Sequence, residues 1–304
     1  MSSDLEAETG NICCASCDIA EVDVIKLKEC NDCDLVRYCS DECQEKHRPH
    51  HESKCKERAA ELRDEILFRQ PESSHHGDCP ICFLPLSIDT DESSLYGCCS
   101  KLICNGCAYA NQKRAFKENL EHNCPFCRKI LTKTQEEMIQ NNMKRADAND
   151  PVALQDMAKR YYHEGDYERS FQYWTNAAEL GDAEAHHCLS IMYAKGEGAE
   201  KNEKMELYHE EEAAIRGHPT ARHFLACMEL INERFGRAVK HLIIAANLGF
   251  DESVQALKTR YADGKVSKED FAAALRAHHA AVDATKSPQR EVAAKAEATG
   301  WRRI

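Results

Sequence analysis

The sequence predicts a multidomain chain in which two small cysteine-rich modules precede an all-α solenoid of helical repeats. The 304 residues are too many for one small core and enough for several domains of ordinary size. Sixteen of the eighteen cysteines lie between Cys13 and Cys127, so the chain divides into a cysteine-rich half and a cysteine-poor half. A short motif that ends in glycine recurs through the second half, which indicates repeated helical hairpins.

Composition narrows the class of protein. The formal net charge is −12 and no large cluster of lysine and arginine is visible, so we expect no nucleic-acid partner. No apolar run approaches the roughly eighteen residues of a membrane-spanning helix, so we expect no membrane partner. The N-terminal residues lack the basic and apolar regions of a signal peptide. We therefore expect a cytoplasmic or nuclear protein, since clustered cysteines in those reducing surroundings bind metal more often than they form disulfides.

A flexible N-terminus over residues 1–12 is expected to precede the first module, over residues 13–56. This module contains four ligand pairs at metal-binding spacing, because a Cys-x2-Cys turn or one helical turn directs two side chains at one ion. Four such pairs supply two tetrahedral zinc sites. The pairs are Cys14/Cys17, Cys30/Cys33, Cys39/Cys43 and His51/Cys55.

The spacing and the segment VRYCSDECQ closely resemble a MYND zinc finger. The resemblance implies that one zinc is held by Cys14, Cys17, Cys39 and Cys43, and the other by Cys30, Cys33, His51 and Cys55. His50 competes for the histidine position, and we prefer His51 because it completes the His-x3-Cys pair. MYND fingers bind short, often proline-containing peptides, so we expect peptides as partners. Arg48 stands where many MYND fingers have tryptophan, which departs from the usual peptide preference.

A helical linker is expected over residues 57–75, because Leu62 and Ile66 lie among charged residues until Pro71 breaks the pattern. The second module follows over residues 76–132 and contains three Cys-x2-Cys pairs. Their order and flanking residues, CPIC, LICNGC and CPFCR, resemble a RING finger. In that family the first and third ligand pairs share one zinc and the second and fourth share another. The resemblance gives an all-thiolate site of Cys79, Cys82, Cys104 and Cys107.

The other RING-type site has Cys124 and Cys127 and needs two further ligands. Lys101 stands at the usual histidine position, and a hydrated, charged lysine is a poor zinc ligand. Some RING variants use eight cysteines, and Cys99 matches their offset, with Cys98 as its partner. His122 is an alternative ligand, and a weakened second site is the remaining alternative. We prefer Cys98 and Cys99, provided that the backbone turns beside Gly97.

RING fingers contain no nucleophile, so no catalytic residue is predicted. They hold a ubiquitin-charged conjugating enzyme against a substrate protein. In that family an aliphatic residue, a proline and a basic residue on the zinc loops contact the conjugating enzyme, and here Ile81, Pro125 and Arg128 hold those positions. Without such docking, Ile81 would pack the module, Pro125 would shape a zinc turn and Arg128 would be a surface charge.

A polar linker over residues 133–150 leads to helical repeats over residues 151–283. Asp150 before Pro151 predicts a capped helix start. The motifs AAELGDA, AAIRGHP and AANLGFD place Gly181, Gly217 and Gly249 at 36- and 32-residue spacing, each closing a helix. The pattern resembles Sel1-like, tetratricopeptide-type repeats, with three clear copies and a weaker fourth. Residues 284–304 form a C-terminal tail, helical or disordered.

Together these observations predict a zinc-binding adaptor with about four Zn²⁺ per chain, from its ligand count. The first functional hypothesis is a RING-type E3 ubiquitin ligase whose partners are a conjugating enzyme and substrate proteins, the latter selected by the repeats or the MYND module. The second is a non-catalytic scaffold that only binds proteins. The run His186, His187 and Cys188 is interpreted as part of the repeats, because it has no partner at metal spacing.

Overall fold

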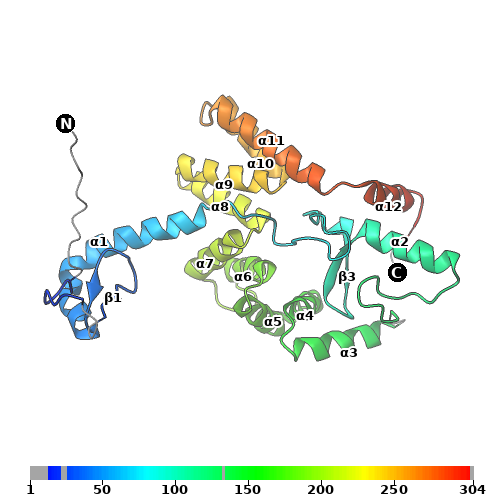
Figure 1. The fold of residues 1–304 in the computed structure, drawn as a ribbon, viewed down its shortest axis with the longest axis horizontal. Helices are drawn as coiled ribbons and strands as arrows, with labels where there is room; N and C mark the ends of the chain where they lie inside the picture. The colour runs from blue at the N-terminus through cyan, green and yellow to red at the C-terminus, as the bar shows by residue number, and fades with distance from the viewer. Residues whose placement is uncertain (1–12, 22–25, 132–133, 302–304) are drawn as a thin grey trace, which may run out of the picture. The chain divides into compact units, whose positions relative to one another are not determined.

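The computed structural model describes residues 13–21, 26–131 and 134–301, so the expected N-terminal segment 1–12 lies outside the described residues. The chain divides into two compact units, Met1–Arg69 and Gln70–Ile304 (Figure 1). In the part of the chain that is described, no helix combines the length and apolarity needed to cross a bilayer.

The first unit consists of a small hairpin and one long helix. Strand β1 (Lys28–Glu29) pairs antiparallel with β2 (Arg37–Tyr38), and helix α1 (Asp41–Leu67) follows directly. The Ser40 hydroxyl accepts a hydrogen bond from the Cys43 amide and caps α1. The buried core contains Tyr38 and cysteine side chains. A segment with so few apolar residues needs its ligands to hold it together.

Helix α1 runs farther toward the N-terminus than the expected linker helix of residues 57–75. It begins at Asp41, includes His51 and Cys55 of the first module, and ends at Leu67. Pro49 lies inside it. The last ligands of the module and most of the linker therefore belong to one continuous helix.

The second unit begins with the second cysteine-rich module. A 3₁₀ turn, η1 (Thr90–Glu92), leads into an antiparallel hairpin of β3 (Ser93–Tyr96) and β4 (Lys101–Cys104), followed by α2 (Asn105–Lys117). Tyr96 pairs with Lys101, so residues 97–100 form the hairpin turn. This turn contains Cys98 and Cys99.

The expected polar linker of residues 133–150 contains a helix, α3 (Gln135–Ala146), capped by the Thr134 hydroxyl. Four helical hairpins follow and stack side by side (Figure 1). Their helices are α4 (Pro151–Glu164) with α5 (Tyr167–Glu179), α6 (Ala183–Lys195) with α7 (Glu203–Ile215), α8 (Pro219–Ile231) with α9 (Phe235–Asn247), and α10 (Asp251–Ala262) with α11 (Lys268–Ala284).

The helix ends predicted from single residues are confirmed. The Asp150 carboxylate accepts hydrogen bonds from the amides of Val152 and Ala153, with Pro151 in the first turn. Gly181, Gly217 and Gly249 follow α5, α7 and α9 with φ values of 84°, 83° and 93°. This left-handed backbone favours glycine, so the repeat glycines end these helices as predicted.

The hairpins bury a continuous apolar interior. Trp174, Ala177 and Leu189 belong to one cluster, and Leu242, Ala246 and Leu257 to another. Small alanines at the contacts let neighbouring helices approach closely. The all-α repeat solenoid predicted from the sequence is confirmed by these hairpins.

The predicted tail contains a helix, α12 (Pro288–Ala298), which packs against α2 of the cysteine-rich module (Figure 1). Ala293 on this contact is fully buried. The end of the chain therefore returns to the module with which the second unit begins.

Candidate metal centres and docking surface

The first module brings the first expected ligand set together. The sulfurs of Cys14, Cys17, Cys39 and Cys43 all lie within 4.8 Å of one another. The Sγ atoms of Cys17 and Cys39 are 3.5 Å apart, and those of Cys39 and Cys43 are 3.6 Å apart. Cys39 precedes α1 and Cys43 lies in its first turn, so the start of the helix presents both sulfurs.

The second set of this module, Cys30, Cys33, His51 and Cys55, is also gathered within 4.8 Å, and all four side chains are buried. His51 Nε2 lies 3.2 Å from Cys33 Sγ, and Cys30 Sγ lies 3.6 Å from Cys55 Sγ. His50 is exposed and is not part of the set. His47 instead contacts the Tyr38 hydroxyl at 2.9 Å. Burial and the nearby Cys30 and Cys33 thiolates raise the pKa of Tyr38 to about 12.

In the second module, Cys79, Cys82, Cys104 and Cys107 form a third set within 4.8 Å. Cys82 Sγ lies 3.7 Å from Cys104 Sγ. Cys104 ends β4 and Cys107 lies in the first turn of α2, so the junction of strand and helix fixes one ligand pair. Cys82 is half-buried, whereas the other three side chains are buried.

The fourth set consists of Cys98, Cys99, Cys124 and Cys127, again within 4.8 Å. Cys98 Sγ is 3.4 Å from Cys127 Sγ, and Cys99 Sγ is 3.7 Å from Cys124 Sγ. The tight turn between β3 and β4 lets these adjacent cysteines face one point, with the Cys99 amide bonded to the Tyr96 carbonyl.

The other candidates for this site lie elsewhere. Lys101 is exposed on β4, with its ammonium 6.0 Å from the centre of the Phe126 ring, and His122 is exposed and outside the four-sulfur set. Gly97 has an ordinary negative φ, but a Cβ there would come within 2.8 Å of Asn142 Oδ1. A residue larger than glycine would therefore have to displace the Asn142 side chain of α3.

The four sets have the chemistry and spacing that zinc needs. The eighteen cysteines, all within the described residues, form no disulfides. In a tetrahedron with Zn–S bonds of about 2.3 Å, two sulfurs lie about 3.8 Å apart, whereas a disulfide needs about 2.05 Å. The Sγ pairs at 3.4 to 3.7 Å match the tetrahedron. The clusters are therefore suited to zinc and consistent with several Zn²⁺ ions per chain, while the ligand role of each residue stays a prediction.

The three residues predicted to contact a conjugating enzyme lie on the loops of the second module. Ile81 is half-buried against its core, Pro125 is half-buried, and Arg128 is exposed. Two aromatic residues on the same loops are open to solvent, Phe83 at 76% and Phe126 at 43% exposure. The loops of the second module that contain Phe83 and Phe126 thus both present apolar surface.

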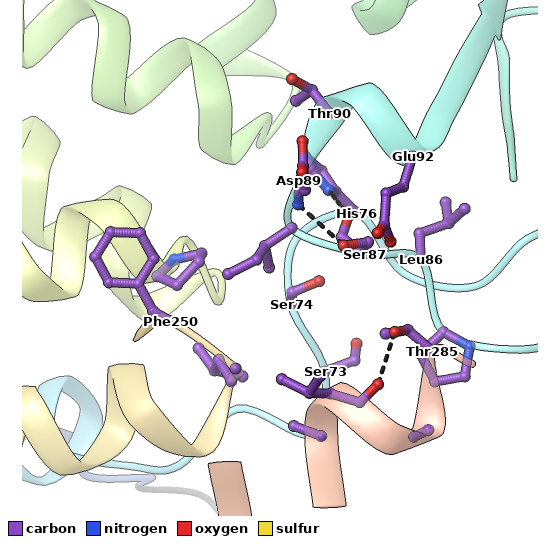
Figure 2. A pocket seen from close by; sticks show the side chains of 18 of the residues that line it. Ser73, Ser74, His76, Leu86, Ser87, Asp89, Thr90, Glu92, Phe250 and Thr285 are labelled. Carbon is purple, nitrogen blue, oxygen red and sulfur yellow. Dashed lines mark hydrogen bonds between the residues drawn. The ribbon is translucent and has the colours of Figure 1, made fainter. Parts of the chain in front are cut away.

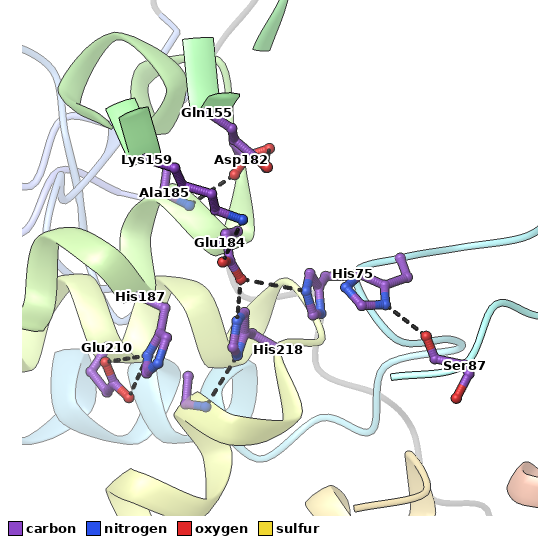
Figure 3. A network of polar contacts seen from close by, with 12 residues as sticks. His75, Ser87, Gln155, Lys159, Asp182, Glu184, Ala185, His187, Glu210 and His218 are labelled. Atoms are coloured by element: carbon purple, nitrogen blue, oxygen red, sulfur yellow. Dashed lines mark hydrogen bonds and ion pairs between the residues drawn. The ribbon is translucent and has the colours of Figure 1, made fainter. Parts of the chain in front are cut away.

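A polar network that sequence reasoning missed joins this module to the repeats (Figure 3). The Glu184 carboxylate accepts a hydrogen bond from His218 Nε2 at 3.1 Å and pairs with the Lys159 ammonium at 3.1 Å. His75 stacks on His218 with ring centres 4.2 Å apart. Burial alone would raise the pKa of Glu184, but the hydrogen bond from His218 and the charge of Lys159 hold it well below its usual range.

His75, Glu184 and His218 lie within 4.8 Å of one another, close enough to hold a metal ion, but the His218 Nε2 that faces this cluster is used as a hydrogen-bond donor to Glu184. His218 Nδ1 accepts the Ala221 amide, which places the ring proton on Nε2, the atom that would have to bind the ion. His75 Nε2 and His218 Nε2 both face Glu184 Oε2, at 3.9 Å and 3.1 Å, and the two ring planes differ by 19°. The network therefore holds residues 75 and 76 against the repeats.

The side chains of His186, His187 and Cys188 do not meet at a common site. His186 contacts His209 at 3.0 Å, and His187 contacts the buried Glu210 carboxylate at 3.1 Å. Burial raises the pKa of the Cys188 thiol. The interpretation of this run as part of the repeat packing agrees with these separate partners.

A recess of about 1020 Å³ lies between the start of the second module, the turns before α8 and α10, and the last two helices. Figure 2 shows Asp89, Glu92 and Phe250 among its lining residues. The lining has more carboxylates than cations, which opposes the entry of phosphate-rich ligands. The acidic residues are Glu72, Asp89, Glu92, Glu184, Asp251, Glu252, Glu291 and Glu297.

Comparison with known families identifies one match, a zinc finger described as "MYND finger", over residues 14–55. These residues include all eight expected ligands of the first module, whose MYND resemblance is thereby confirmed. No curated protein matches the chain.

Among solved structures, the chain is similar to a Sel1 repeat protein from Oxalobacter formigenes, with 24% identity and a TM-score of 0.41. That match covers 55% of this chain and 66% of the other. It is also similar to c5321, a protective antigen from uropathogenic Escherichia coli with an SLR fold, with 16% identity, a TM-score of 0.38, and coverage of 57% and 38%. The chain spans less than two thirds of either protein.

Proposed function

We propose that this zinc-binding protein is a RING-type E3 ubiquitin ligase of the cytoplasm or nucleus, built on a MYND finger and helical repeats that bind proteins. The observation that carries the proposal is the interleaving of two four-sulfur sets between Cys79 and Cys127. The first and third cysteine pairs share one set, and the second and fourth pairs share the other. This is the order of ligands that the RING resemblance implies, and Cys98 and Cys99 complete it.

Zinc in this module would be structural, because four protein ligands leave no open coordination position for chemistry. The two ions would fix the loops before Phe83 and around Phe126, which are otherwise too short to fold alone. Ile81 and Pro125 give these loops an apolar contact surface, and the exposed Arg128 adds a donor beside them. Their arrangement supports docking of a conjugating enzyme.

The ligase would act by position alone. It would hold the conjugating enzyme and a substrate protein together, so that the ubiquitin thioester meets a substrate amine at high effective concentration. The stacked repeats and the MYND finger supply surfaces for that substrate and for short peptides. The acidic lining of the recess favours a substrate with basic segments over an acidic one.

The test is an autoubiquitylation assay of the full chain with a panel of conjugating enzymes. We expect product with at least one enzyme, and we expect Ile81→Ala and Arg128→Ala to lower the rate by roughly tenfold or more, as loss of interface anchors does. Arg114→Ala is the matched control, because Arg114 is an exposed cation in the last turn of α2.

No product with any conjugating enzyme that is active in a reference reaction would favour the non-catalytic scaffold. Product that both Ile81→Ala and Arg128→Ala leave unchanged would reject the docking surface while leaving the ligase activity in place.

A further inference from the structure

The cation Arg290 reaches the zinc-binding loop of the second module from the far end of the chain. It lies on α12, and its Nη2 donates to Cys82 Sγ at 3.5 Å and to the Leu84 carbonyl at 3.2 Å. Its Nη1 donates to the carbonyls of Pro85 and Thr285, each at 2.6 Å. One guanidinium therefore bonds both a predicted zinc ligand and the backbone that follows it.

The helix that carries Arg290 is seated on the module by specific contacts. Gln289 donates to the Gly106 carbonyl at 3.1 Å, and Asn105 donates to Glu297 at 3.1 Å. A Cβ on Gly106 would come within 2.9 Å of the Arg290 backbone nitrogen, so only glycine allows α12 to lie this close. These contacts fix the position of the guanidinium.

Trp301 extends the contact with the second module beyond the end of α12. Its indole Nε1 donates to Gln112 at 2.9 Å, and its ring meets Tyr109 edge-on with centres 5.2 Å apart. Both partners lie on α2. The contact between α12 and α2 is thus polar and aromatic as well as apolar, which makes it specific.

The charge of the site explains why a cation belongs there. Four thiolates around one Zn²⁺ carry a net charge of −2, and a buried negative charge is unfavourable unless a cation or hydrogen bonds offset it. Cys82 is the half-buried member of its set, and its sulfur is the one that Arg290 contacts. Hydrogen bonds to metal-bound thiolates orient the ligands and strengthen metal binding.

We propose that Arg290 is a positioning residue of the zinc site formed by Cys79, Cys82, Cys104 and Cys107. Helix α12 would then help to stabilise a module that precedes it by more than 150 residues. The guanidinium offsets the charge of the zinc–thiolate centre and holds the backbone of residues 82–85. Ile81, the proposed docking residue, immediately precedes this backbone. The inference rests on zinc occupancy of this site but not on ligase activity.

The experiment measures zinc release from the full chain to a chromophoric chelator, with total zinc determined beforehand. We expect Arg290→Ala to release one zinc ion per chain at least about tenfold faster than wild type, the usual effect of losing a partner of a metal ligand. Arg290→Lys keeps the charge but loses the planar guanidinium with its several donors. Its rate of zinc release should therefore lie between those of wild type and Arg290→Ala. Lys295→Ala is the matched control, because it removes a cation from the exposed face of α12.

Two further variants separate the possible failures. Trp301→Ala weakens the packing of the C-terminal segment on α2 but keeps Arg290. A smaller increase in zinc release than that of Arg290→Ala therefore supports a direct role of the guanidinium. Release from Arg290→Ala that equals release from Lys295→Ala would overturn the inference. A zinc content that Cys82→Ser leaves unchanged would overturn both the site and the role of Arg290, whereas a lowered content in Cys82→Ser with unchanged release in Arg290→Ala would overturn the role of Arg290 alone.

Discussion

Cys98 and Cys99 lie in a single hairpin turn and meet Cys124 and Cys127 there. We expect Cys98→Ser to lower the zinc content by one ion per chain, because a serine hydroxyl is a poor replacement for a thiolate ligand. The measurement is metal analysis of the purified protein. His122→Gln is the control, since His122 lies outside the four-sulfur set, and it should leave the content unchanged.

A zinc content unchanged in Cys98→Ser but lowered in His122→Gln would transfer the ligand role to His122. The sequence left both residues open, because spacing alone does not reveal how a hairpin turns.

His241 is a residue whose titration should weaken the repeats in acid. Burial lowers its pKa to about 3, and the nearby charge of Arg222 acts in the same direction. Its pKa in the unfolded chain is about 6.5. Below that value the unfolded chain binds a proton that the folded chain does not, so stability is complete above about pH 6.5 and falls as the pH decreases toward 3.

We expect wild type to lose about 2 kcal/mol more unfolding free energy than His241→Gln between about pH 7 and pH 5. Urea unfolding at both values measures the difference. Loss of zinc in acid affects both proteins and cancels in the comparison. Equal losses in the two proteins would show that folding leaves the pKa of His241 unchanged.

At the scale of the elements, the turn between α7 and α8 holds the segment before the second module. Gly217 has a φ of 83°, and a Cβ there would come within 2.7 Å of the Ser73 carbonyl oxygen. Gly165, after α4, has a φ of 80° but nothing within 4 Å of its Cβ position. Both positions have a left-handed backbone that would strain alanine, and they differ in the space around the added Cβ.

We therefore expect Gly165→Ala to cost about 1 to 2 kcal/mol of unfolding free energy, from its left-handed backbone alone. Gly217→Ala should cost at least about 1 kcal/mol more, because residues 73–75 must move away from the repeats. Denaturant unfolding of both variants measures the costs. Equal costs would mean that this segment is not held against α8.

Elements with local signals could be predicted from the sequence, and elements fixed by distant contacts could not. Cysteine pairs with two or three intervening residues, Asp150 before Pro151, and the repeat glycines each depend on one turn of backbone, so their spacing identifies them. The start of α1 was missed because Pro49 and the zinc ligands interrupt the usual helical pattern. The packing of α12 on the second module could not be predicted, because Arg290 and its partner Cys82 are 208 residues apart.

The polar network at Glu184 was missed for the same reason. Its members come from the segment before the second module, from α4, from α6 and from the start of α8. A single histidine or glutamate on a helix has no spacing signal. Only the folded chain brings these residues to one place.

At the scale of the whole molecule, the second unit joins a cysteine-rich module, a repeat solenoid and a returning C-terminal helix, while the MYND finger belongs to the first unit. Because α12 packs on α2, the repeats and the second cysteine-rich module are connected at both ends of the second unit. A protein bound by the repeats would therefore lie at a restricted position relative to the cysteine clusters of the second module.

We predict that sixteen residues of this chain form four zinc sites. Native mass spectrometry of the protein, compared with its mass after denaturation in acid, measures the number of bound zinc ions most directly. We predict four zinc ions per chain, from four tetrahedral ligand sets. A chain that retains only the two ions of the MYND finger would contradict it.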